Sequence, residues 1–416
     1  MAQLSDDCFA FGGELLTVDA ALALIAERVA PVVEAETASV ADAFGRILAE
    51  DVVAGMDLPP HANSAVDGFA IAHADLLPDG ETVLPVGGRA AAGHPFGRPL
   101  KPGEAVRIFT GAPMPDGADT VMMQEDCVAA EGTVRLRPGI RRGANRRLAG
   151  EDVACGTVAL PAGRRLRAAD LGMAAALGRS ELPVFRRLRV ALLSTGDEVR
   201  EPGAALPDGA IYDANRFMLR ALLGALGCVV TDLGILADRA TALADALAAA
   251  AGHDLLITSG GVSTGEEDHV RTVIERLGRV DFWRLAIKPG RPVALGQIRG
   301  TPLIGLPGNP VAAAVTFIVL ARPLILRLAG AVEPPPPLFR VRADIAYRKK
   351  PGRREYVRAR LERDADGLIA RKYEKDGAGI LSSITRSDGL VVLDEATSTI
   401  APGTPVDFLP FAEVLG

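Results

Sequence analysis

The sequence is poor in the residues that build metal centres, disulfide scaffolds and base-stacking surfaces. Its four cysteines are far apart and include no Cys-x-x-Cys pair, which argues against a disulfide framework and against a cysteine zinc site. Its five histidines show no helical metal-ligand spacing. Aromatic residues make up only 4% of the chain, and 46 Lys and Arg against 52 Asp and Glu give a net charge of −6. A general nucleic-acid binder is therefore not expected.

Long hydrophobic runs and a targeting segment are also missing. The longest apolar run, residues 311–321, is interrupted by Thr316 and is shorter than the ~20 residues of a membrane span. Residues 1–11 carry acidic side chains where a signal peptide has a basic segment. With 49% hydrophobic and 24% charged residues, the composition is that of a soluble globular protein. We therefore expect the protein in the cytoplasm, without membrane contact.

What is present indicates several domains, because 416 residues exceed the size at which one hydrophobic core stops growing. Thr17 is a typical N-cap for the helical pattern at residues 18–29, and further helical patterns cover residues 40–48 and 168–177. The residues between these patterns are short β-type runs broken by Gly and Pro. We predict a discontinuous helical N-terminal domain, residues 14–52 and 148–183, with an inserted β domain, residues 53–147.

Residues 184–332 alternate short apolar runs with helical patterns, which is typical of a doubly wound, mostly parallel sheet. The expected helices, each with a glycine at or near its end, are residues 216–226, 241–251, 268–277 and 311–328. Four consecutive prolines at 334–337 indicate a stiff linker to a C-terminal β domain, residues 338–416. The predicted fold class is therefore α/β and multidomain.

Three glycine-rich turns each follow an apolar run of this central domain. They are residues 194–198 (Ser-Thr-Gly-Asp-Glu), 259–263 (Ser-Gly-Gly-Val-Ser) and 306–310 (Leu-Pro-Gly-Asn-Pro). Parallel sheets bind ligands outside the carboxyl ends of their strands, and small-residue turns expose backbone N–H groups to a phosphate. Carboxylates in or near the first two turns suggest a bridging metal or a neighbouring cation. A single such turn would be an ordinary strand end with exposed acids, but three in one sheet favour a shared ligand edge.

Several charged residues have both a functional and an ordinary interpretation. Lys288 and Arg291 flank a Pro-Gly turn and could converge on one anion, although charged residues near turns are usually solvated. The arginine-rich residues 135–147 suit oxyanions, but most of them are expected on a solvated face. Asp67 precedes Gly68, and a role as a turn or cap residue is the simpler local interpretation.

Seven motifs in order give the chain a close resemblance to the molybdopterin molybdenumtransferase (MoeA) family, to which the gephyrin E domain is related. The match runs from about Thr17 to the C-terminus. The motifs are Asn-Ser-Ala-Val-Asp-Gly-Phe (63–69), Phe-Thr-Gly-Ala-Pro-Met-Pro (109–115), Gly-Glu-Asp (150–152), Ala-Ile-Lys-Pro-Gly (286–290), Gly-Leu-Pro-Gly-Asn-Pro (305–310) and the first two glycine turns. Each motif is weak alone, whereas seven in sequence are highly specific.

The resemblance implies insertion of molybdate into adenylylated molybdopterin, with release of AMP and mature molybdenum cofactor. It assigns catalytic roles to Asp67, Asp152, Glu198, Asp238, Asp268 and Lys288. It assigns substrate contacts to Thr110, Arg147, Lys288, Arg291, Arg353 and Ser383. The three glycine turns add the expected substrate-binding residues Ser194, Thr195, Gly196, Asp197, Gly260, Gly261, Ser263, Pro307, Gly308 and Asn309. Mg²⁺ prefers oxygen ligands, and Glu198, Asp238 and Asp268 are its candidate ligands.

The same resemblance implies a homodimer whose active site is composite. Asp67, Thr110, Arg147 and Asp152 would then act across the subunit interface. A molybdopterin adenylyltransferase and apo-molybdoenzymes are candidate protein partners. Two departures from the family pattern concern the anion site, since Arg284 and Arg291 stand where lysines are usual.

Two other functions agree with parts of this sequence. A non-catalytic gephyrin-like scaffold would tolerate loss of the acids, so retention of all five acids and Lys288 favours an enzyme. A nucleotide-processing enzyme of the competence-damage type would share only the sheet domain, and the motifs outside residues 188–330 speak against it.

Overall fold

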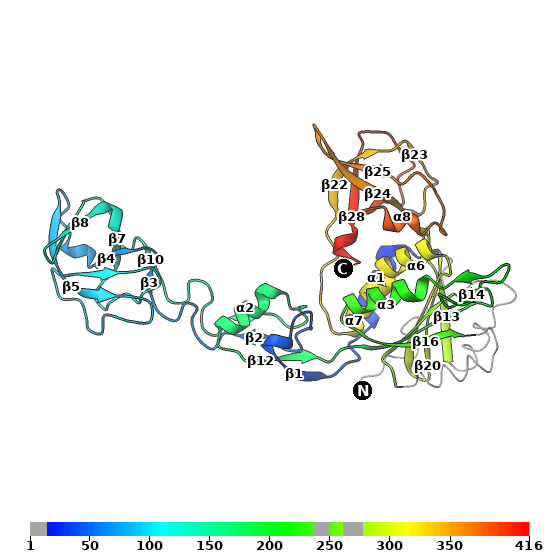
Figure 1. Cartoon of the computed structure of the whole chain (residues 1–416), viewed down its shortest axis with the longest axis horizontal. Coiled ribbons are helices and arrows are strands. Elements are labelled where there is room, and N and C mark those ends of the chain that lie inside the picture. Colours follow the sequence, from blue (N-terminus) through cyan, green and yellow to red (C-terminus); the bar gives the residue numbers. More distant parts are fainter. Residues whose placement is uncertain (1–14, 237–249, 251, 261–277, 416) are drawn as a thin grey trace. The chain divides into compact units, whose positions relative to one another are not determined.

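The computed structural model describes residues 15–236, 250, 252–260 and 278–415. The expected helix at 268–277, nearly all of the one at 241–251, and four predicted site residues lie outside the described residues: Asp238, Gly261, Ser263 and Asp268. The chain divides into two compact units, one of Met1–Glu50, Ala162–Arg167 and Leu182–Gly416, the other of Asp51–Pro161 and Ala168–Glu181 (Figure 1).

A six-stranded sheet forms the centre of the first unit. Its order is β16 (Val229–Leu236), β13 (Arg189–Thr195), β17 (Leu255–Ser259), β21 (Thr301–Leu306), β20 (Pro292–Ile298) and β18 (Gly278–Arg284). The first four strands are parallel, as expected, but β20 pairs antiparallel with both of its neighbours, β21 and β18, so the sheet is mixed. The reason is the two-residue connection Arg299–Gly300, in which both residues have positive φ and which therefore closes a tight hairpin.

Helices cover one side of this sheet. They are α1 (Val18–Arg28), α3 (Asn215–Ala225) and a continuous helix made of α6 (Pro310–Thr316), the π-helical turn η4 (Phe317–Ala321) and α7 (Arg322–Leu328). Pro310–Leu328 is long and apolar enough to cross a membrane by composition, but 83% of its apolar window is buried inside the protein. It is a core helix, because Phe317, Leu320 and Leu324 pack in one cluster with Trp283 and the helix α1 residue Ile25.

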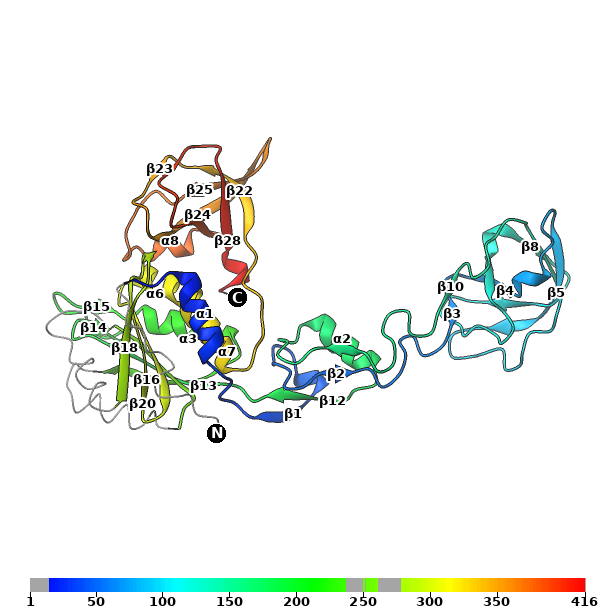
Figure 2. The same cartoon turned by 180° about the vertical axis from the view of Figure 1, so that it is seen from behind.

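A five-stranded barrel ends the chain. Strands β24 (Arg354–Asp364), β25 (Gly367–Lys372), β22 (Phe339–Asp344), β28 (Pro405–Pro410) and β26 (Gly389–Leu393) pair in this order, and β26 returns to β24. Short elements complete it: β23 (Tyr347–Arg348) pairs with β27 (Thr399–Ile400), and α8 (Ser382–Thr385) and η5 (Phe411–Glu413) follow the strands. In Figure 2 the helices lie between this barrel and the sheet, and Tyr356, Leu390 and Leu409 of the barrel join their core cluster.

The helical N-terminal domain is a wrong prediction, since the N-terminal region is mainly β. Helix α1 is present, but it belongs to the core of the central sheet. Of the helix expected at 40–48 only the single turn η1 (Val40–Asp42) exists. The reason is Gly45, whose positive φ ends the turn, after which Ile47 and Leu48 form antiparallel bridges. Strand β1 (Ala35–Ser39) likewise pairs with β12 (Glu181–Phe185).

The second unit is built on a six-stranded sheet. Its order is β7 (Thr120–Met123), β4 (Gly68–Ile71), β6 (Ala105–Ile108), β5 (Thr82–Ala90), β9 (Thr133–Leu136) and β8 (Cys127–Ala130). Two-stranded pairs join β3 (Asn63–Ser64) to β10 (Arg146–Arg147) and β2 (Val52–Val53) to β11 (Val158–Leu160). Helix α2 (Ala168–Ala176) and the turns η2 (His73–Asp75) and η3 (Gln124–Asp126) complete the unit. The exact limits of the four predicted domains stay predictions.

Candidate active site

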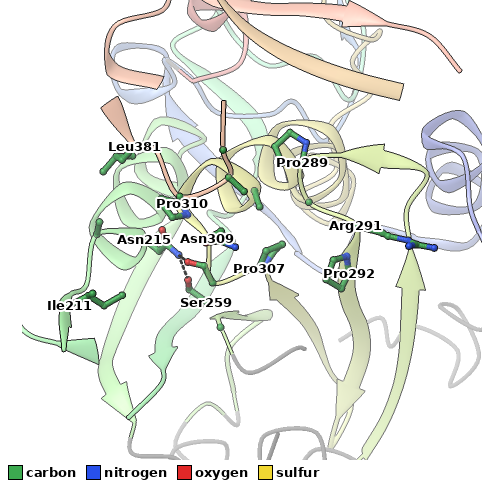
Figure 3. A pocket seen from close by; sticks show the side chains of 18 of the residues that line it. Ile211, Asn215, Ser259, Pro289, Arg291, Pro292, Pro307, Asn309, Pro310 and Leu381 are labelled. Atoms are coloured by element: carbon green, nitrogen blue, oxygen red, sulfur yellow. Dashed lines mark hydrogen bonds between the residues drawn. The ribbon is translucent and has the colours of Figure 1, made fainter. Parts of the chain in front are cut away.

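A cleft of about 1160 Å³ lies in the first unit, between the carboxyl edge of the central sheet and the C-terminal barrel (Figure 3). Ten of the residues predicted from the sequence line it: Ser194, Thr195, Gly196, Glu198, Gly260, Lys288, Arg291, Pro307, Gly308 and Asn309. The cleft is therefore where the sheet-edge turns and the Lys288–Arg291 turn come together.

The sheet register explains why the three glycine turns meet. Ser194 of β13 lies opposite Ser259 of β17, and Ser259 lies opposite Leu306 of β21, so all three strands end at the same edge. Gly260 then approaches its neighbours closely: its N–H donates to the Leu306 carbonyl at 3.0 Å. A Cβ on Gly260 would lie 2.7 Å from the Thr195 carbonyl oxygen, and φ is +87°. Only glycine fits this position without moving the turn.

Asn215, which the sequence interpretation missed, ties two of these turns together. Its buried side chain donates from Nδ2 to Ser259 Oγ at 2.9 Å and to the Gly308 carbonyl at 2.7 Å (Figure 3). It is the first residue of α3, a place where the sequence shows only an ordinary polar helix start. The amide thus fixes the second glycine turn against the third.

Replacing Asn215 with Asp is expected to loosen this edge, because Asp keeps the size of the side chain but loses both N–H donors. The catalytic rate should fall about tenfold, while the melting temperature falls by only a few degrees. The measurement is the turnover defined under Proposed function, with thermal unfolding followed by circular dichroism. Unchanged turnover in Asn215→Asp would show that the two turns do not depend on this link.

A cluster of carboxylates around the buried Arg216 side chain holds the start of α3. Arg216 pairs with Asp213 at 3.0 Å, with Asp232 at 2.5 Å and with Glu201 at 2.5 Å. Burial by itself would lower the pKa of Arg216, but hydrogen bonds to the three carboxylates, that to Asp232 first, raise it above its usual value. The carboxylates come from three places: Asp232 lies in β16, Glu201 follows the short strand β14 (Val199–Arg200), and Asp213 follows the short strand β15 (Ile211–Tyr212). The cluster joins all three to the helix that carries Asn215.

Hydroxyl groups at the sheet edge are unsatisfied within the described part of the chain. Ser194 Oγ, Thr195 Oγ1 and Thr258 Oγ1 are buried and have no hydrogen-bond partner there. Ser194 and Thr195 line the cleft together with Glu198. Buried polar atoms are normally paired, so these hydroxyls are suited to a polar ligand. Asp197 is exposed and lies outside the cleft lining; its carbonyl accepts from Arg200.

The barrel supplies the opposite wall. The short strand β19 (Ile287–Lys288) pairs in parallel with β24, which places Lys288 opposite Glu355. Lys288 Nζ lies 3.2 Å from Glu355 Oε2, and the Tyr347 hydroxyl donates to the same oxygen at 2.7 Å. Tyr347, Glu355 and Arg358 all line the cleft, and no motif in the sequence pointed to them.

The remaining predicted residues of the first unit have different places. Arg291 lines the cleft, its Nε is without a partner among the described residues, and in Figure 3 its side chain runs away from the Asn215–Ser259 pair. Ser383 is fully buried and accepts from Arg358 Nε at 3.1 Å, so it supports the wall without lining it. Arg353 is exposed outside the lining, and its carbonyl accepts from Lys349 Nζ.

The second unit brings Asp67 and Thr110 together from two motifs. Asp67 Oδ1 accepts hydrogen bonds from the Thr110 backbone N–H and from its hydroxyl, each at 2.8 Å. The backbone hydrogen bond first, and the hydroxyl second, hold the pKa of the Asp67 carboxyl below its usual value. Arg147 is exposed and lies opposite Asn63, which belongs to the same motif as Asp67. Asp152 is exposed, and its N–H donates to the Leu58 carbonyl.

Replacing Thr110 with Val is expected to raise the pKa of Asp67 toward its ordinary value, because one of two donors is lost. Since the depressed pKa favours the carboxylate, this hydrogen bonding stabilises the fold above the usual Asp pKa, and the contribution disappears as pH falls through the folded-state value. The check is an NMR titration of the Asp67 carboxyl carbon in both proteins. Identical titration curves would contradict the assignment.

Comparison with known proteins extends over nearly the whole chain. Three family profiles match consecutive regions: "MoeA N-terminal region (domain I and II)" at residues 16–178, "Probable molybdopterin binding domain" at 191–327 and "MoeA C-terminal region (domain IV)" at 340–411. The molybdopterin molybdenumtransferase of Haemophilus influenzae is 39% identical over 97% of this chain and 100% of its own. Molybdopterin molybdenumtransferase 2 of Mycobacterium tuberculosis is 36% identical over 88% of this chain and 93% of its own.

Solved structures agree in fold. A molybdopterin biosynthesis MoeA protein from Pyrococcus horikoshii superposes with a TM-score of 0.81 at 27% identity, covering 95% of this chain and 100% of its own. Another structure of a molybdopterin biosynthesis MoeA protein from Pyrococcus horikoshii superposes with a TM-score of 0.75 at 30% identity, covering 96% of this chain and 99% of its own. The three matched regions and the full-length relatives together indicate a multidomain transferase of molybdenum cofactor biosynthesis. The chain belongs to the MoeA family of molybdopterin molybdenumtransferases.

Proposed function

We propose that this protein transfers molybdenum from molybdate to the dithiolene of adenylylated molybdopterin in the cytoplasm, with release of AMP. The observation that carries the proposal is the cleft itself. On one side it has glycine turns and unpaired hydroxyls, which suit phosphate oxygens, and on the other the ammonium of Lys288. Full-length relatives named as transferases support this function over a non-catalytic scaffold. The matches outside the sheet domain likewise oppose an enzyme that shares only that domain.

The sheet edge would bind the pyrophosphate of the substrate. Backbone N–H groups in small-residue turns can approach phosphate oxygens closely, and Gly308 leaves such space, since an added Cβ there would meet only Gly260 Cα, at 3.8 Å. The hydroxyls of Ser194 and Thr195 would add two donors that cost nothing to desolvate further, because they are already buried. The turns would thus orient the phosphoanhydride before any bond breaks.

Lys288 would act on the charge that develops in the reaction. When water attacks the phosphoanhydride, its oxygen stays on the attacked phosphorus and the P–O bond to AMP breaks. Negative charge then grows on the leaving AMP phosphate, and a fixed ammonium nearby stabilises it. Lys288 and Arg291 would also hold the molybdate dianion beside the dithiolene sulfurs. Arg291 offers a fork of donors in place of a compact ammonium, which suits two oxygens of one oxyanion.

The residues around the sheet edge fit a magnesium ion by the chemistry of their donors. Glu198, Ser194 and Thr195 offer only oxygen atoms to the cleft, and Mg²⁺ prefers oxygen ligands while keeping several waters. Glu198 would hold the ion, with Asp238 and Asp268 as the further predicted ligands outside the described residues. Bound there, the ion would neutralise part of the pyrophosphate charge.

The assay of AMP release tests the proposal. Purified protein is incubated with adenylylated molybdopterin, Mg²⁺ and molybdate, and AMP and molybdenum cofactor are quantified. We expect both products in equal amounts and only when molybdate is present. Absence of AMP release by the wild-type protein would overturn the proposed function. Full activity of Asp268→Ala would remove the role of that acid while leaving the function intact.

We infer in addition that the protein is a homodimer with a composite site, in which Asp67, Thr110, Arg147 and Asp152 serve the site of the partner subunit. A molybdopterin adenylyltransferase would supply its substrate and apo-molybdoenzymes would accept its product. Mixing two inactive variants, Asp67→Ala and Lys288→Ala, should restore about a quarter of wild-type activity after random subunit exchange. No recovery in a confirmed heterodimer would contradict the composite site.

A further inference from the structure

Glu355 is the buried partner of the exposed lysine in the cleft. Its side chain is 7% exposed, whereas that of Lys288 is 58% exposed. Two hydrogen bonds reach the same carboxylate oxygen, one from Lys288 Nζ and one from the Tyr347 hydroxyl. The Tyr347 ring also lies beneath the ammonium, with Nζ 6.0 Å from the ring centroid. A carboxylate buried to this degree is normally paired, and Lys288 is the cation that pairs it here.

The backbone fixes this arrangement before any ligand enters. Lys288 lies in register with Glu355 because β19 pairs in parallel with β24, and the Arg354 N–H donates to the Ala286 carbonyl at 2.8 Å just before that pair. Burial first, and the Glu355 carboxylate second, raise the pKa of Tyr347, so this hydroxyl stays a donor at neutral pH. Glu355 Oε2 therefore has a permanent donor in the Tyr347 hydroxyl and a second donor in Lys288 Nζ.

Lysine needs such an anchor to act on a transition state. Its ammonium sits on a flexible four-carbon stem, and an unrestrained exposed lysine samples many rotamers. We propose that Glu355 is a positioning residue for the reaction, which holds the Lys288 ammonium on the barrel side of the cleft where it meets the reacting phosphate. This inference rests on the proposed function and concerns a residue that does not itself touch the substrate.

The Glu355→Gln variant distinguishes an effect on the position of the Lys288 ammonium from an effect on substrate binding. The amide keeps the shape and the bond from Tyr347 but removes the charge that holds Lys288. We expect kcat for AMP release to fall at least about tenfold, because a misplaced ammonium loses stabilisation that only the transition state uses. The KM for molybdate should change less than about threefold, since the lost carboxylate also makes the cleft more positive. Glu355→Asp, which keeps the charge, should recover most of kcat.

A double-mutant cycle decides whether Glu355 acts through Lys288. In the Lys288→Ala background, Glu355→Gln should change kcat less than about twofold. A merely structural role of Glu355 would give the same loss in both backgrounds and would overturn the proposal, as would unchanged kcat in the single variant. Asp254→Asn is the matched control: Asp254 is a buried carboxylate paired with Arg186 at 2.6 Å, outside the cleft lining, and its loss should affect stability but not kcat.

Chemical modification of Lys288 tests its ion pair with Glu355 without an activity assay. Lys288 Nζ is reductively methylated under limiting reagent, and its modification is followed by mass spectrometry, with exposed Lys101 of the second unit as internal reference. Modification requires the pair with Glu355 to open, so its rate relative to Lys101 should rise about fivefold or more in Glu355→Gln and stay near wild type in Glu355→Asp. Equal rates in all three proteins would overturn the anchor. If the wild type releases no AMP but the rates differ, the proposed function fails and the anchor stands.

Discussion

Replacing Lys288 with Ala is expected to lower the rate of AMP release about a hundred- to a thousandfold, the range seen when one preorganised donor is removed from a charged transition state. The residue lines the cleft opposite the glycine turns, and the fixed pair with Glu355 orients it. The melting temperature should fall by a few degrees as well, because Glu355 loses the cation that pairs its buried charge. The checks are single-turnover AMP release and thermal unfolding.

Two further variants make this result specific. Lys288→Arg keeps the charge but replaces a compact ammonium by a planar fork, so an intermediate loss is expected. Lys350→Ala removes an exposed barrel lysine that lies outside the cleft lining, and its activity should stay within about twofold of wild type. If Lys288→Ala lost no more activity than Lys350→Ala, the Lys288 ammonium would have no part in stabilising the transition state.

The sheet-edge half of the site was predictable because its determinants are local. Each glycine turn follows a short apolar run, and parallel strands must end together at one edge, so Ser194, Ser259 and Leu306 meet without any knowledge of long-range contacts. A local sequence pattern does not show which side chain links the turns. Asn215 reaches Gly308 across 93 residues of sequence, and its own surroundings read as a plain helix start.

The residues that the barrel contributes to the cleft were not predictable, because they are far from Lys288 in the sequence. Glu355 and Tyr347 lie 67 and 59 residues beyond Lys288, and only the short parallel pairing of β19 with β24 brings them to the cleft. A two-residue strand leaves no periodic signal in the sequence. The same limitation explains the wrong prediction of a helical N-terminal domain. The sequence around Ile47 and Leu48 is compatible with a helix, but these two residues form β-bridges to the distant residues Arg165 and Val184.

The second large effect is expected at Gly290, in the turn that carries both Lys288 and Arg291. Gly290 is buried with φ of +102°, and an added Cβ would lie 2.3 Å from Thr316 Oγ1 and 3.1 Å from the Ala312 carbonyl oxygen. Thr316 is fully buried in the core helix, so neither atom can move away freely. Gly290→Ala should therefore destabilise the protein by about 2–5 kcal/mol, the sum of about 1–2 kcal/mol of backbone strain and about 1–3 kcal/mol of overpacking.

Gly352→Ala separates these two contributions. Gly352 has a similar φ of +87°, but an added Cβ would meet no atom within 4 Å. It should cost only the conformational part, about 1–2 kcal/mol, and leave AMP release unchanged. Gly290→Ala should in addition lower AMP release by at least about a hundredfold below its melting temperature, because displacing the turn by as little as ~1 Å moves Lys288 and Arg291 together. Equal free energies of unfolding for Gly290→Ala and Gly352→Ala in chemical denaturation would mean that the core helix moves to make room for the methyl group. The turn would then be placed by the β19–β24 pairing alone.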